Sequence, residues 1–238
     1  MIAIIQARNT STRLRGKVLL PLGDTTVLDY VVTRACCIKG LREVIVAIPD
    51  TGSEDIFNWC KENGIRCFRG SEDNVLQRYV HCARLYNVKY IMRITADCPF
   101  IDYETASKMV SIMQSEEGDI MTCSEEKPRG LAVEIISKSA LETIYSADDL
   151  EDRHREHVTY YAYEYLDKFK EVTYKVDKVP LHNEMRITLD TIQDYLMLSE
   201  LAELAGSPTV PTKEVIKILE DNPQLRNINK DVRQKPVI

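Results

Sequence analysis

Short apolar runs rich in β-branched residues alternate with amphipathic stretches along the first half of the chain. The apolar runs have the length of strands, and the stretches between them repeat apolar residues at helical spacing. The pattern predicts strands at 2–6, 44–48, 66–68 and 90–95, and helices at 27–38, 54–63 and 72–86. Strands that alternate with helices indicate a mostly parallel sheet with helices on both of its faces.

The alternation becomes irregular beyond about residue 118. There the pattern predicts strands at 119–123, 131–136, 171–176 and 186–189, with helices near 138–146 and 154–168. Mixed or antiparallel additions to the sheet are expected in this half. Because no Pro/Gly/Ser-rich linker separates the halves and no internal repeat is visible, we interpret residues 1–238 as a single α/β domain.

Punctuation residues support these helices. Gly40 and Gly64 lie where helix C-caps are expected, and Ser53 and Ser71 precede helices as N-cap candidates. Asp102 is expected to cap the helix that follows it. These positions agree with the apolar periodicity.

Composition and charge narrow the classes of function. The chain has 31 Lys and Arg against 37 Asp and Glu, a net charge of −6, which argues against a nucleic-acid-binding protein with a broad basic face. No apolar segment approaches the roughly 20 residues that a membrane span needs. The chain starts with a strand-like run, without a secretory leader, so we expect a cytoplasmic protein with no membrane partner.

The seven cysteines form neither a disulfide framework nor a zinc site. They are odd in number and include no C-x-x-C pair. We therefore expect buried free thiols, at positions 36, 37, 60, 67, 82, 98 and 123.

The first predicted strand is followed by a basic loop. Arg8, Arg13, Arg15 and Lys17 lie close together, and no carboxylate precedes Asp24. Loops at the carboxyl edge of an open α/β sheet line its ligand crevice, which suits an anionic ligand. The loop lacks the spacing of a phosphate-binding P-loop, and the chain has no G-x-G-x-x-G dinucleotide motif. By itself, the loop could equally be a solvated surface whose arginines pair with acidic helices.

Two aspartates directly follow predicted strands. Asp97 comes after "YIMRIT" and Asp190 after "MRITL", so both are expected at the sheet edge that carries the site. A Mg²⁺ ion commonly takes one or two carboxylates and completes its shell with water and phosphate oxygens. Without further context, an aspartate after a strand is more often a helix cap or a turn residue.

Five stretches together resemble a known family. They are "IIQARNTSTRLRGKVL", "FRGSEDNVLQRY", "RITADCPFID", "REHVT" and "RITLDT", in this order over roughly residues 2–200. The sequence is similar to the acylneuraminate and KDO cytidylyltransferases, and most similar to their spore-coat polysaccharide biosynthesis branch. The resemblance implies a three-layer α/β/α sandwich of the nucleotide-diphospho-sugar transferase type with a mostly parallel mixed sheet. It also implies a homodimer.

The reaction that the resemblance implies joins CMP from CTP to a sugar acid and releases pyrophosphate, for surface polysaccharide synthesis. The family's positions map Mg²⁺ onto Asp97 and Asp190, and catalysis onto Arg13, Lys17 and Asp97. The implied nucleotide-binding residues are Ala7, Arg8, Arg13, Lys17, Gly70, Ser71, Glu72 and Arg78. The implied residues for the sugar are Arg129, Glu134, Arg155 and His157.

Some of these positions have ordinary structural explanations. Ser71 followed by Glu72 and Asp73 also reads as a helix start that complements the helix dipole. His154 and His157 lack the companion ligands of a metal site, so packing or hydrogen bonding at a helix surface is the favoured explanation.

The sequence departs from the family pattern at three positions. Arg15 replaces a usual proline, Ala96 replaces a glycine before Asp97, and Ala132 stands where an aspartate is frequent. Two other functions therefore stay open: a glycosyltransferase of the same fold, although the chain has no D-x-D motif, and a non-catalytic nucleotide-binding assembly subunit.

Overall fold

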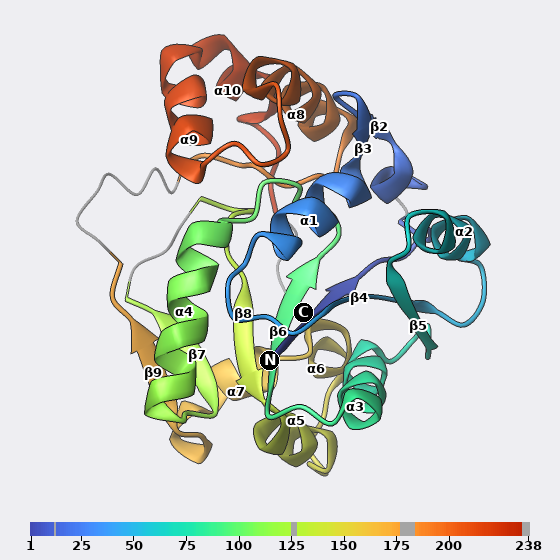
Figure 1. Ribbon diagram of the computed structural model, residues 1–238, viewed down its shortest axis with the longest axis vertical. Coiled ribbons are helices and arrows are strands. Elements are labelled where there is room, and N and C mark those ends of the chain that lie inside the picture. The colour runs from blue at the N-terminus through green and yellow to red at the C-terminus, as the bar shows by residue number, and fades with distance from the viewer. Residues whose placement is uncertain (12, 125–127, 177–183, 235–238) are drawn as a thin grey trace.

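A seven-stranded mixed sheet forms the centre of the computed structural model, which describes residues 1–11, 13–124, 128–176 and 184–234 (Figure 1). The strand order is β5-β4-β1-β6-β8-β7-β9. Four strands run parallel at one side: β1 (Ile2–Gln6), β4 (Val44–Pro49), β5 (Arg66–Gly70) and β6 (Tyr90–Thr95).

The second half of the chain extends this sheet. The added strands are β7 (Ile120–Cys123), β8 (Glu134–Ser137) and β9 (Glu171–Tyr174). β8 pairs antiparallel with both β6 and β7, whereas β9 pairs parallel with β7. The sheet is therefore parallel except for β8, as the two sequence patterns predict.

Helices cover both faces of the sheet, which confirms the α/β sandwich. One face packs against α1 (Val27–Cys36), α2 (Glu54–Glu62) and α4 (Tyr103–Glu116). The other packs against α3 (Val75–Tyr86), α5 (Lys138–Tyr145), α6 (Asp152–His157) and α7 (Tyr160–Glu164), with the 3-10 turn η2 (Leu166–Lys168). Strand residues alternate between the two cores because successive side chains point to opposite faces.

A third apolar core lies outside the sheet. It joins α8 (Ile192–Ala205), α9 (Thr212–Asp221) and α10 (Pro223–Asn229) to α1 and to the hairpin of β2 (Pro21–Leu22) and β3 (Thr25–Thr26). Figure 1 shows these three helices gathered at one end of the molecule. None of the described helices is long and apolar enough to cross a membrane.

Buried Arg34 ties this third core to the rest of the protein. Its guanidinium donates to the carbonyls of Ile101, Pro208 and Val210 at 2.7–2.8 Å. It also lies 4.9 Å from the ring centroid of Tyr103. The side chain is fully buried, so each of these bonds replaces one that water would make.

Several predicted elements differ from the observed ones. The helix expected at 154–168 is split into α6, α7 and η2, because Val158 adopts φ 53° and interrupts the hydrogen-bond ladder. The segment 186–189 is extended but forms only an isolated bridge between Arg186 and Arg129. The strand expected at 131–136 begins at Glu134.

Helix caps also differ in part. α3 begins at Val75, because Asn74 rather than Ser71 accepts from the Gln77 amide, at 2.9 Å. α1 ends at Cys36, so Gly40 lies beyond its cap. Gly64 follows the cap of α2 with φ +67°, and Asp102 caps α4 by accepting from the Thr105 amide at 3.0 Å, as predicted.

All seven cysteines are free, as predicted, but their burial differs. Cys60 and Cys82 are buried, whereas Cys36 and Cys123 are exposed. The expectation that the thiols are buried is therefore wrong for the exposed pair, which lies at the end of α1 and the end of β7.

Candidate active site

Three loops meet beyond the carboxyl ends of β1 and β6. The loop after β1 leads into the 3-10 turn η1 (Lys17–Leu19), and Asp97 follows β6. The extended segment before α8 brings Asp190 to the same place, because the Leu189 amide donates to the Asp97 carbonyl at 2.8 Å. The two aspartates expected to converge from distant segments are thus neighbours.

Lys17 lies between these aspartates. Its Nζ donates to Asp97 Oδ2 at 2.7 Å, to Asp190 Oδ1 at 3.0 Å and to the Leu189 carbonyl at 2.6 Å. Its side chain is only 11% exposed. Burial alone would lower the pKa of Lys17, but the two carboxylates outweigh burial and raise it. Lys17 is therefore a buried, fully hydrogen-bonded cation.

Asp190 binds two further cations. Arg13 Nη2 lies 3.1 Å from its Oδ1, and Arg186 Nη2 lies 2.9 Å from its Oδ2. Burial would raise the pKa of Asp190, but Lys17, Arg13 and Arg186 together lower it. The carboxylate is thus ionised and fully paired.

Asp194 fixes the far side of this group. Its Oδ1 accepts from Arg186 Nε at 2.8 Å, and its Oδ2 accepts from the backbone amides of Asp190 and Thr191, each at 3.0 Å. It is also part of the capping box that starts α8. We call this group the aspartate cluster: Arg13, Lys17, Asp97, Arg186, Asp190 and Asp194.

The remaining cations of the basic loop face outward. Arg8 pairs with Glu156 of α6 at 3.1 Å, and both side chains are about half exposed. Arg15 is exposed. Gly16 adopts φ +67° directly before η1, a conformation that favours glycine, and the turn it makes sends Lys17 inward while Arg15 points out.

The loop from Gly70 to Glu72 is shaped from beneath by Arg78. This arginine is 1% exposed, and its guanidinium donates to the carbonyls of Ser71 at 3.0 Å and Glu72 at 3.4 Å. A side chain on Gly70 would press on Arg78 Cγ at 3.1 Å. Ala7 is buried beside this region, and its amide donates to the Ala47 carbonyl at 3.0 Å. Arg78 therefore acts on the loop backbone.

A second charged group lies on the strands themselves. Arg93 of β6 donates through Nη1 to Glu134 Oε2 at 2.7 Å and through Nε to Gln6 Oε1 at 3.1 Å. The Thr159 hydroxyl donates to the same Glu134 oxygen. We call Gln6, Arg93, Glu134 and Thr159 the Arg93 cluster. Burial would lower the pKa of Arg93, but the Glu134 charge raises it.

His157 lies near the Arg93 cluster. Burial, with help from the positive charge of Arg93, lowers its pKa, although Glu156 and Glu134 act in the opposite direction. His157 is therefore neutral near pH 7. His154 is fully buried instead, with Nε2 2.6 Å from Glu164 Oε2, so the predicted hydrogen bonding is present but lies inside the protein rather than at a helix surface.

The other two residues expected to contact the sugar lie apart from Glu134. Arg155 donates to the Leu150 carbonyl at 2.9 Å, in the turn before α6. Arg129 is exposed, and its backbone pairs with the segment at Arg186. Ala132 is also exposed.

Residues that sequence reasoning missed hold both clusters together. Arg186 and Asp194 fix Asp190. Arg93 and Thr159 fix Glu134, and Gln6 holds Arg93. The sequence did contain a signal for the Arg93 cluster. Gln6 and Arg93 are polar residues in otherwise apolar strands, and a polar or charged side chain that is buried there needs a partner.

The carboxylates of the aspartate cluster could supply part of the coordination shell of a hard divalent cation. Asp97 and Asp190 offer carboxylate oxygens on either side of one position that a cation already fills. Across the described ranges, no group of three or more His, Cys, Asp or Glu side chains is placed to hold a metal ion. The pair therefore fits Mg²⁺ only when water or phosphate oxygens complete the shell.

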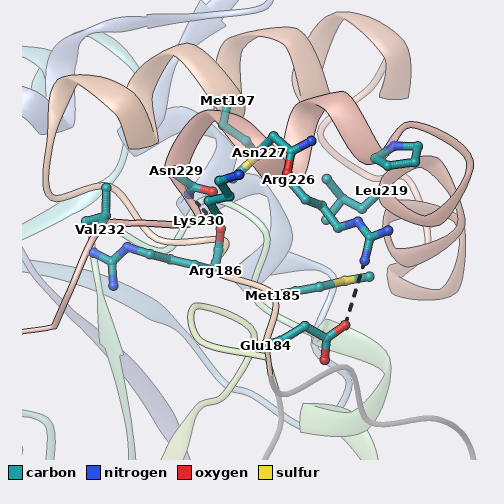
Figure 2. Close-up of a pocket in the computed structure, with 11 residues that line it drawn as sticks. Glu184, Met185, Arg186, Met197, Leu219, Arg226, Asn227, Asn229, Lys230 and Val232 are labelled. Carbon is teal, nitrogen blue, oxygen red and sulfur yellow. Dashed lines mark hydrogen bonds and ion pairs between the residues drawn. The ribbon is translucent and has the colours of Figure 1, made fainter.

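A pocket of about 400 Å³ lies behind the aspartate cluster, between α8–α10 and residues 184–186 (Figure 2). Arg226 Nη1 and Glu184 Oε1 approach to 3.8 Å across it. Arg186 lines this pocket and also binds Asp190, so it separates the pocket from the cluster.

A mostly parallel sheet with cations and paired aspartates at its carboxyl edge places this chain among the α/β proteins that are built to bind an anionic ligand at that edge. Within that class, the chain belongs to the cytidylyltransferase family, because the model of that family matches residues 2–229. The chain is 34% identical to the spore coat polysaccharide biosynthesis protein SpsF of Bacillus subtilis, over 94% of this chain and 95% of that protein.

Two solved structures are similar to this chain. A cytidylyltransferase from Leptospira borgpetersenii superposes with a TM-score of 0.89 at 32% identity, covering 99% of this chain and 98% of that one. A CMP:2-keto-3-deoxy-manno-octonic acid synthetase complexed with CTP superposes with a TM-score of 0.64 at 14% identity, covering 85% and 97%. The second likeness shows the shared fold.

Proposed function

We propose that this protein transfers CMP from CTP to a sugar acid with release of pyrophosphate, as a step in making a surface polysaccharide. The observation that carries the proposal is the convergence of Arg13 and Lys17 with Asp97 and Asp190 at the carboxyl edge of the sheet. Family membership supports the choice of CTP. The likeness to SpsF supports a role in polysaccharide synthesis.

On this proposal, the nucleotide lies along the edge beyond β1, β4 and β6. Lys17 and Arg13 would turn from the aspartates to the triphosphate, and Arg8 would leave Glu156 to join them. The backbone of Gly70, Ser71 and Glu72, braced by Arg78, would face the base or ribose, and Ala7 would allow close approach. Cationic donors aligned on phosphate oxygens lower the barrier to phosphoryl transfer through charge and positioning.

Asp97 and Asp190 would hold Mg²⁺. When bound, that ion reduces the repulsion between the phosphate oxygens and the incoming hydroxyl. Asp190 is prepared for this role because Arg186 keeps its Oδ2 in place while its Oδ1 is shared by Lys17 and Arg13.

The acceptor sugar would lie on the side of the Arg93 cluster. Glu134 has its Oε2 occupied by Arg93 and Thr159, and its orientation is therefore set before any ligand arrives. Neutral His157 can donate or accept at the same side. Arg155 would have to leave the Leu150 carbonyl to reach such a ligand, and Arg129 would approach from its exposed position.

A pyrophosphate-release screen tests the proposal. The four nucleoside triphosphates are each incubated with Mg²⁺ and a panel of nonulosonic and other sugar acids. We expect release with CTP and at least one acid. Release with another nucleotide would overturn the choice of CTP. In a separate incubation with a nucleotide sugar in place of the triphosphate, transfer of the sugar without pyrophosphate release would indicate a glycosyltransferase. Nucleotide binding without any turnover would indicate an assembly subunit. The homodimer stays a prediction, which sedimentation equilibrium can test.

A further inference from the structure

The cation site between Asp97 and Asp190 is filled by the chain itself. All three donors of the Lys17 ammonium are used, by Asp97 Oδ2, Asp190 Oδ1 and the Leu189 carbonyl. A divalent ion shared by the same two oxygens would need to lie about 2.1 Å from each of them. It would therefore occupy nearly the space of the ammonium, and the two cations exclude each other.

The charges around this position are balanced. Three cations, Arg13, Lys17 and Arg186, face three carboxylates, Asp97, Asp190 and Asp194. A free divalent ion approaching the cluster thus meets little net negative charge. A triphosphate changes the balance because it brings several negative charges and additional oxygen ligands.

The cluster contains both fixed and releasable parts. Asp190 Oδ2 is held by Arg186, which is itself anchored to Asp194, a fully buried residue. In contrast, Asp190 Oδ1 and Asp97 Oδ2 are held by Lys17 and Arg13, on a loop with Gly16 as its turn. If Lys17 and Arg13 moved away, Asp97 Oδ2 and Asp190 Oδ1 would be released while both aspartates stay in place.

We propose that Lys17 is the resting counter-ion of the Asp97–Asp190 pair, so that a divalent metal binds there only with or after the nucleotide. The phosphates attract Lys17 and Arg13, and the two oxygens that these side chains release become metal ligands. The inference rests on the proposed nucleotide-dependent function and adds an order of binding to it. Lys17 thus keeps the metal site closed to free metal.

The test is a titration of the full chain with Mn²⁺ alone, in which free Mn²⁺ is followed by electron paramagnetic resonance. Mn²⁺ takes oxygen ligands as Mg²⁺ does. K17M should bind Mn²⁺ about tenfold more tightly than the wild type, within the usual range for coupled sites. K17R, which keeps the charge, and R15M, which removes a charge from the same loop without touching the aspartates, should match the wild type.

Two further titrations test whether the gain in Mn²⁺ affinity arises at the Asp97–Asp190 pair. The double variant K17M/D97N should lose the added affinity, because a released oxygen is missing. At saturating CTP, the difference between K17M and the wild type should fall below about twofold, because Lys17 has then moved to the phosphates. If K17M melts early, K17Q replaces it, since its amide can still donate to the Leu189 carbonyl.

Three results would overturn the inference: equal Mn²⁺ affinity of K17M and the wild type without nucleotide, a gain that survives D97N, or a tenfold difference that persists with CTP. The nucleotide-free titration contains neither CTP nor acceptor. Its outcome is therefore independent of the pyrophosphate screen, and failure of the proposed function would be seen only there.

Discussion

The aspartate cluster and the Arg93 cluster lie at the same end of the sheet, but they are built differently. Most side chains of the aspartate cluster stand on segments that follow β1 and β6 or precede α8, and Asp194 lies in the first turn of α8. Lys17 binds both Asp97 and Asp190, and Arg13 binds Asp190. Arg93, Gln6 and Glu134 stand on neighbouring strands, where Arg93 is the direct register partner of Glu134 and Gln6 lies on β1 opposite Thr95. Loop cations can exchange partners when a ligand arrives, whereas strand side chains present a fixed surface. The comparison predicts that changes in the first cluster affect nucleotide and metal binding and that changes in the second affect stability.

The largest effect is expected for D97N. Loss of one carboxylate charge should lower Mg²⁺-dependent pyrophosphate release on the order of a thousandfold, because metal-assisted charge stabilisation supplies several kcal/mol. Lys17 keeps Asp190 and the Leu189 carbonyl as partners, so the fold should persist. The measurement is single-turnover pyrophosphate release, with the melting temperature as a control for folding. Wild-type turnover in D97N would remove Asp97 from the site.

The second effect is on stability, in R93M. Removing the guanidinium leaves the Glu134 charge without its partner beside the core, which should lower the unfolding free energy by about 3 kcal/mol. Urea denaturation measures the change. The matched control is R93M/E134M, in which both charges are gone and most of the loss should be recovered. Equal stability of R93M and the wild type would show that this pair does not hold the strands.

The third effect is on CTP binding, which should depend on the aspartate cluster and not on the Arg93 cluster. K17A should reduce the rise in melting temperature caused by CTP, because a charge-assisted contact with phosphate is worth about 2 kcal/mol, or roughly thirtyfold in affinity. E134Q, a change in the Arg93 cluster, should keep the full rise. Each shift is measured against the nucleotide-free melting temperature of the same variant. A full CTP shift in K17A, or its loss in E134Q, would reverse the assignment of the clusters.

The smallest effect concerns pH and His157. Because the pKa of His157 is lowered in the folded protein by burial and by Arg93, the unfolded chain binds the proton more readily. This contribution to stability is complete above about pH 6.5, the unfolded pKa, and is lost as pH falls through the folded pKa. H157N should therefore lose less stability than the wild type between pH 7.5 and pH 5.5 in urea titrations. Parallel pH profiles of the two proteins would contradict this prediction.

Local pattern was sufficient for much of the fold. β1 and β6 have the predicted bounds, since short β-branched runs enclosed by helical periodicity leave little choice. The meeting of Asp97 and Asp190 followed from two strand-like segments that each end in an aspartate. It was correct although residues 186–189 do not join the sheet, because their extended backbone is bound to the Asp97 carbonyl instead.

Other features depended on contacts that local pattern does not contain. The break at Val158 interrupts a segment with helical spacing, and it places Thr159 against Glu134. Arg34, which is fully buried, and Arg93, whose side chain is 10% exposed, are ordinary basic residues in the sequence, and only their distant partners explain their burial.

The sequence by itself determined the alternation of strands and helices, the mostly parallel sheet and the set of charged residues at its edge. Backbone propensity and apolar periodicity act over a few residues, so these properties are local. The tertiary structure decided which charges are paired: Lys17 between two aspartates, Asp190 against Arg186, and Arg93 against Glu134. Such pairs join residues up to 173 positions apart, and a charge in a sequence does not specify which opposite charge the fold will place beside it.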